Sequence, residues 1–146
     1  MPVKPIPEGY PRVSPYLIVE DGAETMEFIK YVFGAKVKER MTFPDGTVNH
    51  GEVSIGDSVI MLGKASENYP PQTTMLYIYI EDTDAAYKRA IEKGAVSVME
   101  PADQFYGDRN AGVKDQNGIS WWIATHVEDV SPEELLRRNE ECAKKQ

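Results

Sequence analysis

The sequence contains almost no cysteine and no long apolar run. Its 146 residues include one cysteine, Cys142, which excludes an intramolecular disulfide and a zinc site built from several cysteines. Cys142 lies in a charged C-terminal segment, which favours an incidental surface thiol over a catalytic one. No apolar stretch approaches the ~20 residues that a transmembrane helix requires. Residues 1–9 hold three prolines and lack the apolar core of a secretory signal, so we expect a cytoplasmic protein.

Positive charge is also scarce. The chain has 16 Lys and Arg against 24 Asp and Glu, which gives a formal net charge of −8. Nucleic-acid phosphates and anionic membrane surfaces both attract Lys and Arg, so we expect neither nucleic acid nor membrane as a partner. The acidity would suit a cationic ligand, although solubility alone accounts for the charge of most acidic domains. Apolar residues make up 41% of the chain, enough for the core of one domain.

The most informative feature that is present is an internal repeat. Residues 16–21, YLIVED, and residues 77–82, YIYIED, align at an offset of 61 and share Tyr, Glu and Asp. Each is a β-type segment that ends in an acidic signal for a helix start. Apolar residues at helical spacing follow over 23–33 and over 83–93, and a Gly-Ala pair closes each helix. The repeat therefore predicts two copies of a strand–helix unit.

Three strands are expected after each helix, because turn residues such as Asp45-Gly46 and Asn117-Gly118 separate the β-type segments. The predicted fold class is α+β, a single domain over 1–146 made of two tandem β-α-β-β-β modules and a C-terminal helix. The expected strands span 36–43, 48–55 and 58–62 in the first copy and 96–101, about 109–114 and 120–124 in the second. Module 1 covers about 10–63, the linker 64–73 and module 2 about 74–126.

The C-terminal helix is expected over about 132–145. Ser131-Pro132-Glu133-Glu134 is a capping box with proline at the first helical position. The helix has few apolar residues, so it is expected to pack lightly against the domain or against a partner subunit.

Paired β-α-β-β-β modules of this length, over about residues 10–126, resemble the glyoxalase/bleomycin-resistance/extradiol dioxygenase superfamily, also called vicinal oxygen chelate. The resemblance implies that the two modules form a curved mixed sheet with a concave pocket. Several stretches also resemble one branch of this superfamily, the PhnB-like proteins. These stretches are Ser14-Pro15-Tyr16-Leu17, Asn49-His50-Gly51-Glu52, Gln104-Phe105-Tyr106-Gly107-Asp108-Arg109, Trp121-Trp122-Ile123-Ala124-Thr125-His126 and residues 128–134. Some members of the branch are labelled as methyltransferase-like, but no Gly-rich nucleotide loop follows the first strand here, so the sequence does not support a methyltransferase.

In metal-dependent members of this superfamily, four side chains from the first and last strands of the modules bind the ion. The resemblance places these positions at Ser14, Met61, Met75 and Trp122, and the repeat offset of 61 links 14 to 75 and 61 to 122. Divalent ions in such sites need imidazole, carboxylate or thiolate ligands, which serine, methionine and tryptophan do not provide. We therefore expect no metal there and no other cofactor.

The same positions predict a pocket instead. Successive strand residues alternate between the faces of a sheet, so Trp122 and residues of its parity face the concave side, and Trp121 faces the helices. An apolar wall with a few polar groups is typical of a small-molecule site. The same residues would also fill a collapsed core, and both interpretations stay open. The expected ligand-binding residues are Tyr16, Met61, Met75, Tyr77, Tyr79, Tyr106, Arg109 and Trp122.

Three further polar groups have open interpretations. His50 and Glu52 are the candidate catalytic residues, because two side chains on one strand face can act as general acid and base. A hydrogen-bonded pair at a subunit edge explains them equally well. Tyr106 and Arg109 would either close over a ligand and hold an anion or form an ordinary turn. His126, just beyond the last strand, is expected to be structural.

Two functions of different classes remain. The first is a metal-free binding protein that holds an aromatic or cationic small molecule in the pocket. The second is an enzyme such as a lyase or isomerase, with His50 and Glu52 as acid and base or with a relocated metal site; an inert structural module is a weaker third option. Whether the chain is an enzyme is left open. We expect a bacterial protein and a homodimer, because sheet edges of this kind need a partner.

Overall fold

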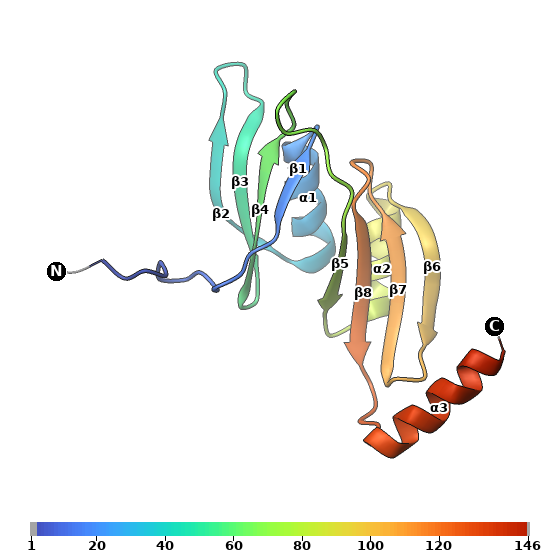
Figure 1. The fold of residues 1–146 in the computed structure, drawn as a ribbon. Coiled ribbons are helices and arrows are strands. Elements are labelled where there is room, and N and C mark those ends of the chain that lie inside the picture. Colours follow the sequence, from blue (N-terminus) through green and yellow to red (C-terminus); the bar gives the residue numbers. More distant parts are fainter. Residues whose placement is uncertain (1–2, 146) are drawn as a thin grey trace. The chain divides into compact units, whose positions relative to one another are not determined.

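The structure, a computed structural model, describes residues 3–145 and divides into two compact units, which join between Thr74 and Met75. Each unit contains one four-stranded mixed sheet with a helix on one face (Figure 1). The predicted α+β fold with two tandem β-α-β-β-β modules and a C-terminal helix is confirmed. Within residues 3–145, no helix is long and apolar enough to cross a membrane.

The first unit runs strand, helix and then three strands. Strand β4 lies between β1 and β3, which gives the order β1-β4-β3-β2. β1 pairs with β4 in parallel, and the remaining pairs are antiparallel. β4 extends to Lys64, two residues beyond the predicted strand end. The elements are β1 Tyr16–Val19, α1 Gly22–Phe33, β2 Lys36–Thr42, β3 Val48–Ile55 and β4 Ser58–Lys64.

The second unit repeats this connectivity, with the order β5-β8-β7-β6 and β5 parallel to β8. β6 continues past Pro101, which an edge strand tolerates because its N–H groups on one side need no partner strand. β7 begins at Asp108, one residue before the predicted start. The elements are β5 Met75–Tyr79, α2 Thr83–Glu92, β6 Val96–Asp103, β7 Asp108–Lys114 and β8 Ser120–His126, followed by α3 Pro132–Lys144.

The repeated Glu-Asp signals start both module helices. Asp21 and Asp82 have extended backbones, and their carboxylates accept hydrogen bonds from the N–H groups of Glu24 and Ala85. Such an N-cap satisfies one of the helix's free donors, and losing it costs ~0.5–2 kcal/mol. Gly34 ends α1 in the left-handed conformation at φ 68°, where its N–H donates to the Lys30 carbonyl. Helix α2 begins at Thr83 as predicted, and α1 begins at Gly22, one residue before the predicted start.

The core of each unit lies between its sheet and its helix. In the first unit, Met26 and Ile29 of α1 are fully buried, as is Leu62 of β4. In the second, Trp121 of β8 is fully buried. Helix α2 packs against one face of this sheet (Figure 1). Full burial of a side chain such as Met26, Ile29 or Leu62 contributes ~1.5–3 kcal/mol. A shift in strand register would expose such side chains, so their burial stabilises the observed register.

Helix α3 is attached by polar contacts. Ser131 Oγ accepts the N–H of Glu134, and Pro132 occupies the first turn. None of the helix's residues, 132–144, is buried. Arg138 donates to the Phe105 carbonyl at 3.0 Å and pairs with Glu128 at 2.9 Å. The expected light packing of this helix is therefore seen in the second unit.

Candidate functional site

The two tryptophans of β8 confirm the predicted strand faces. Trp121 is fully buried on the helix side, and its Nε1 donates to Asp115 Oδ2 at 2.8 Å. Trp122 lies on the opposite face, which it shares with its cross-strand neighbours Tyr77 and Gly112. A Cβ atom at Gly112 would lie 3.0 Å from the Trp122 ring. Glycine therefore provides the space in which the indole lies against β7.

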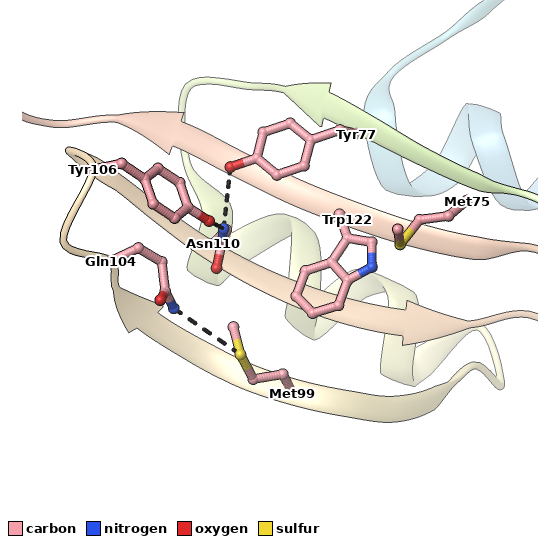
Figure 2. Close-up of a pocket in the computed structure, with 7 residues that line it drawn as sticks. All are labelled: Met75, Tyr77, Met99, Gln104, Tyr106, Asn110 and Trp122. Carbon is pink, nitrogen blue, oxygen red and sulfur yellow. Dashed lines mark hydrogen bonds between the residues drawn. The ribbon is translucent and has the colours of Figure 1, made fainter. Parts of the chain in front are cut away.

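A cavity of about 350 Å³ lies on this face of the second unit (Figure 2). Its volume falls in the ~300–1,000 Å³ range of small-molecule sites. Strands β5 to β8 and the loop between β6 and β7 all contribute to its wall, and no lining side chain is charged. The structure thus brings four of the predicted ligand-binding residues together. The lining residues are Met75, Tyr77, Met99, Gln104, Tyr106, Asn110 and Trp122.

Asn110 is the polar centre of this cavity. The side chain is 2% exposed, and its Nδ2 donates to the Tyr77 hydroxyl at 3.1 Å and the Tyr106 hydroxyl at 2.7 Å. Its Oδ1 is buried and has no hydrogen-bond partner. Figure 2 shows the amide nitrogen directed at the two phenol oxygens and the amide oxygen on the other side. An unpaired buried carbonyl costs ~1–3 kcal/mol, so Oδ1 is a costly unsatisfied acceptor on a residue that lines the cavity.

Asp108 holds the phenol of Tyr77 in place. Its Oδ2 accepts from the hydroxyls of Tyr77 at 2.7 Å and Tyr79 at 2.8 Å, and its Oδ1 lies 3.0 Å from His126 Nδ1. Burial raises the pKa of Asp108, but the hydrogen bonds from His126, Tyr77 and Tyr79 outweigh it, and the pKa lies below its ordinary value. Burial also raises the pKa of Tyr77. At neutral pH, Asp108 is therefore a carboxylate and Tyr77 its hydrogen-bond donor.

Tyr79 and Arg109, also predicted to bind ligand, lie outside the cavity lining. Tyr79 packs edge-on against Tyr77, with ring centroids 5.4 Å apart. Arg109 Nε and Nη2 donate to the two carboxylate oxygens of Asp84 at 2.9 Å, and Nη1 donates to Asp103 at 3.2 Å. Two carboxylates already balance the guanidinium charge, so this geometry gives no support to an anion site at Arg109.

A second polar cluster lies in the first unit, where β3 carries the candidate catalytic residues. His50 Nε2 lies 2.8 Å from Glu52 Oε2, and the Tyr16 hydroxyl lies 3.1 Å from His50 Nδ1. The hydroxyl of Tyr10 donates to Glu52 Oε1. Burial raises the pKa of Glu52, but the hydrogen bonds from Tyr10 and His50 outweigh it, and the pKa lies below its ordinary value. His50 and Glu52 are thus in direct contact, with a tyrosine on each.

Glu39 of β2 completes this cluster. One ligand atom each from Glu39, His50 and Glu52 lie within 4.8 Å of one another. Next to Glu52 is a cavity of about 590 Å³ in the first unit, and the predicted ligand-binding residue Met61 lies in its wall. Tyr16 does not line this cavity; it lies against Gly63 of β4, where an added Cβ would be 2.9 Å from its hydroxyl. The lining residues are Pro7, Tyr10, Pro11, Arg12, Ser14, Glu52 and Met61.

Sequence reasoning missed several of these residues. Asn110 could have been predicted, because alternation along β7 places it on the same face as Gly112, and Gly112 is the cross-strand neighbour of Trp122. Met99 and Gln104 could not, since β6 has register shifts on both sides of Met99 and Gln104 lies in a loop. Tyr10 precedes the first strand, and no periodicity connects it to Glu52.

Comparison with known proteins identifies the family. The model described as Glyoxalase/Bleomycin resistance protein/Dioxygenase superfamily matches residues 11–123. The chain belongs to this superfamily. An uncharacterized protein of Mycobacterium bovis (strain ATCC BAA-935 / AF2122/97) is 29% identical to this glyoxalase-superfamily protein over 136 residues, which cover 86% of the chain and 90% of the relative.

Solved structures share the fold of this glyoxalase-superfamily protein. TioX from Micromonospora sp. ML1 matches with a TM-score of 0.69 and 22% identity, over 80% of this chain and 99% of TioX. A glyoxalase/bleomycin resistance protein/dioxygenase family enzyme from Burkholderia phytofirmans PsJN matches with a TM-score of 0.65 and 18% identity, over 78% of this chain and 97% of the enzyme. At these identities the likeness concerns the fold.

The four positions that the resemblance assigns to metal chelation do not fit a divalent ion here. Ser14 and Met61 line the cavity beside Glu52 in the first unit, and Met75 and Trp122 line the cavity of the second unit. A hydroxyl, two thioethers and an indole lack the imidazole or carboxylate ligands that such ions require. Within residues 3–145, the side chains suited to a metal that converge are those of Glu39, His50 and Glu52.

Proposed function

We propose that this protein binds an aromatic small molecule in the cavity of the second unit, without a metal. The observation that carries the proposal is the wall itself, where Trp122 and Tyr77 face an uncharged space together with Met75 and Met99. Aromatic rings offer flat surfaces to a planar ligand, and methionine adapts to irregular shapes. The chain's net charge of −8 favours a cationic ligand over an anionic one.

The proposal is tested with 9-aminoacridine, a planar aromatic cation, by isothermal titration calorimetry. Trp122→Ala removes the largest ring of the wall and should weaken binding about 30-fold, as loss of an aromatic anchor costs ~2 kcal/mol. Tyr69→Ala is the matched control, because Tyr69 is a 67% exposed aromatic residue that does not line the cavity. Equal affinity in wild type and Trp122→Ala, or no binding by wild type, contradicts the proposal.

The cluster of Glu39, His50 and Glu52 favours a second candidate, an enzyme with a relocated metal site or an acid–base pair. Imidazole and carboxylate are ligand types that bind Zn²⁺ and Fe²⁺ in other proteins. Tyr16 on His50 Nδ1 and Tyr10 on Glu52 resemble the outer hydrogen bonds that orient metal ligands. Without a metal, the contact of His50 with Glu52 suits proton transfer.

Zinc titration followed by calorimetry tests this candidate. A site at the cluster predicts one Zn²⁺ per chain, lost in His50→Gln and in Glu39→Gln and kept in Glu67→Gln, which removes an exposed carboxylate outside the cluster. Equal binding by all four proteins contradicts the site.

We further infer a cytoplasmic homodimer of the PhnB-like branch, in which residues 1–146 act as one domain. The segments around Ser14-Pro15, His50-Gly51 and Trp121-Trp122 support the branch, and the Mycobacterium relative supports a bacterial origin. Each sheet also ends in edge strands, β1 and β2 or β5 and β6, which supports pairing with a second chain.

A further inference from the structure

We propose that the cavity of the second unit selects planar ligands whose edge donates a hydrogen bond, and that Asn110 Oδ1 is the acceptor. The inference rests on the proposed function of this cavity and adds the chemical class of its ligand. It starts from the buried amide oxygen that has no partner, on a residue that lines the cavity.

The orientation of the Asn110 amide follows from its neighbours. A phenol has one proton, and Tyr77 donates it to Asp108 Oδ2 at 2.7 Å. The Tyr77 oxygen must therefore accept from Asn110, so the amide NH₂ faces Tyr77 at 3.1 Å. If the amide were flipped, its carbonyl oxygen would face the Tyr77 oxygen, whose only proton is already donated to Asp108. The carboxylate of Asp108 thus fixes Oδ1 on the side away from the phenols, as Figure 2 shows.

An amide oxygen accepts hydrogen bonds and donates none, so it discriminates between ligands. A ligand edge with N–H or O–H pairs with Oδ1, whereas a carboxylate or a hydrocarbon edge leaves it unpaired. Gln104 and Met99 are the neighbouring parts of the wall, and they are joined by a contact of 4.0 Å between Nε2 and Sδ, longer than an ordinary hydrogen bond. Both side chains are flexible and can yield to a ligand edge that approaches Asn110.

The shape of the wall sets the rest of the ligand class. Trp122, Tyr77 and two methionines favour a flat apolar body, and the cavity volume of about 350 Å³ admits two or three fused rings. The ligand is therefore a fused aromatic or heteroaromatic ring system with an N–H or O–H on its rim. Charge is not required for this contact, because Asn110 is neutral and Asp108 already has three donors.

Indole and 1-benzothiophene test the inference, because they match in shape and charge and indole alone has an N–H. Their affinities are measured by ¹⁵N–¹H NMR titration of the full chain. We expect wild type to bind indole about ten-fold more tightly, the effect of one hydrogen bond to a buried acceptor. If the wall acted through apolar contact alone, wild type would bind benzothiophene more tightly than indole, because benzothiophene is the more hydrophobic ring. The ¹³Cγ shift of Asn110 should move with indole and stay with benzothiophene.

Asn110→Leu supplies the variant arm, since leucine is close in volume and carries no acceptor. It should lose the preference for indole and bind benzothiophene at least as tightly as indole, because the acceptor is gone and the more hydrophobic ring gains more from the apolar wall. Equal binding of the two rings by wild type, or a preference for indole that persists in Asn110→Leu, overturns the inference and leaves the proposed function standing. Binding of neither ring overturns both. If the variant does not fold, the wild-type ratio and the Asn110 shift decide the matter.

Discussion

The indole of Trp122 lies against the backbone of Gly112 on the neighbouring strand, where an added Cβ would come within 3.0 Å of the ring. The pair places a large aromatic surface on the cavity wall without a side chain beneath it. Gly112→Ala should therefore push the indole by a few tenths of an ångström and cost ~1–2 kcal/mol of folding free energy through overpacking. Urea denaturation measures this cost.

A double-mutant cycle shows whether Trp122 is the cause of that cost. In the Trp122→Ala background, Gly112→Ala should cost nothing measurable, because the ring that it contacts is gone. The same loss in both backgrounds would mean that the backbone at Gly112 resists alanine for another reason.

The adjacent tryptophans should respond in opposite ways to truncation. Trp121→Ala removes a fully buried ring and its hydrogen bond to Asp115, so it should lower the free energy of unfolding by ~3–5 kcal/mol. Trp122→Ala should cost less stability and more ligand affinity. Both values come from urea denaturation and from calorimetry with 9-aminoacridine. A stable Trp121→Ala beside an unfolded Trp122→Ala would show that the cavity face is the core.

His126 should make stability depend on pH. Hydrogen bonds to Asp129 and Asp108 raise the pKa of His126 above its ordinary value. A raised pKa means that the protonated side chain stabilises the fold. This stabilisation is complete at pH values below the pKa of histidine in the unfolded chain, about 6.5. It is lost as the pH rises through the higher pKa of His126 in the folded protein. The melting temperature of wild type relative to His126→Gln should thus fall from about pH 6 to about pH 8. A difference that stays constant over this range contradicts the assignment.

The edge strands of the two sheets predict the oligomeric state. Light scattering at micromolar concentration should give about twice the chain mass of 16.4 kDa. The physical reason is that unpaired strand edges expose backbone donors and acceptors, which a second chain can satisfy. A mass of one chain would remove the homodimer from the account.

The fold was predictable because its signals are local and occur twice. The Glu-Asp pairs that end residues 16–21 and 77–82 cap both module helices through Asp21 and Asp82, and Gly34 closes the first helix. Strand alternation then placed Trp121 in the core and Trp122 on the open face. These inferences needed no knowledge of which segments meet in space.

The rest of the site depends on tertiary contacts that periodicity does not encode. Arg109 was expected either to hold an anion or to form an ordinary turn. Neither interpretation indicates its ion pair with Asp84, which belongs to α2 and lies 25 residues away in sequence. The role of Asn110 follows from Tyr77 and Asp108, whose hydrogen bond joins two strands. Register shifts in the pairing of β6 with β7 also made it impossible to predict from alternation that Met99 lines the cavity. Hydrogen-bond partners across strands have to be seen in the structure.

The most direct test of the account is a crystal structure of the protein grown with 9-aminoacridine. The account predicts that the ring system occupies the cavity of the second unit, against Trp122 and Tyr77, with a ring-edge N–H directed at Asn110 Oδ1. Occupancy of the other cavity, beside Glu52 and Met61, would contradict it, as would a Trp122 side chain that fills the space itself.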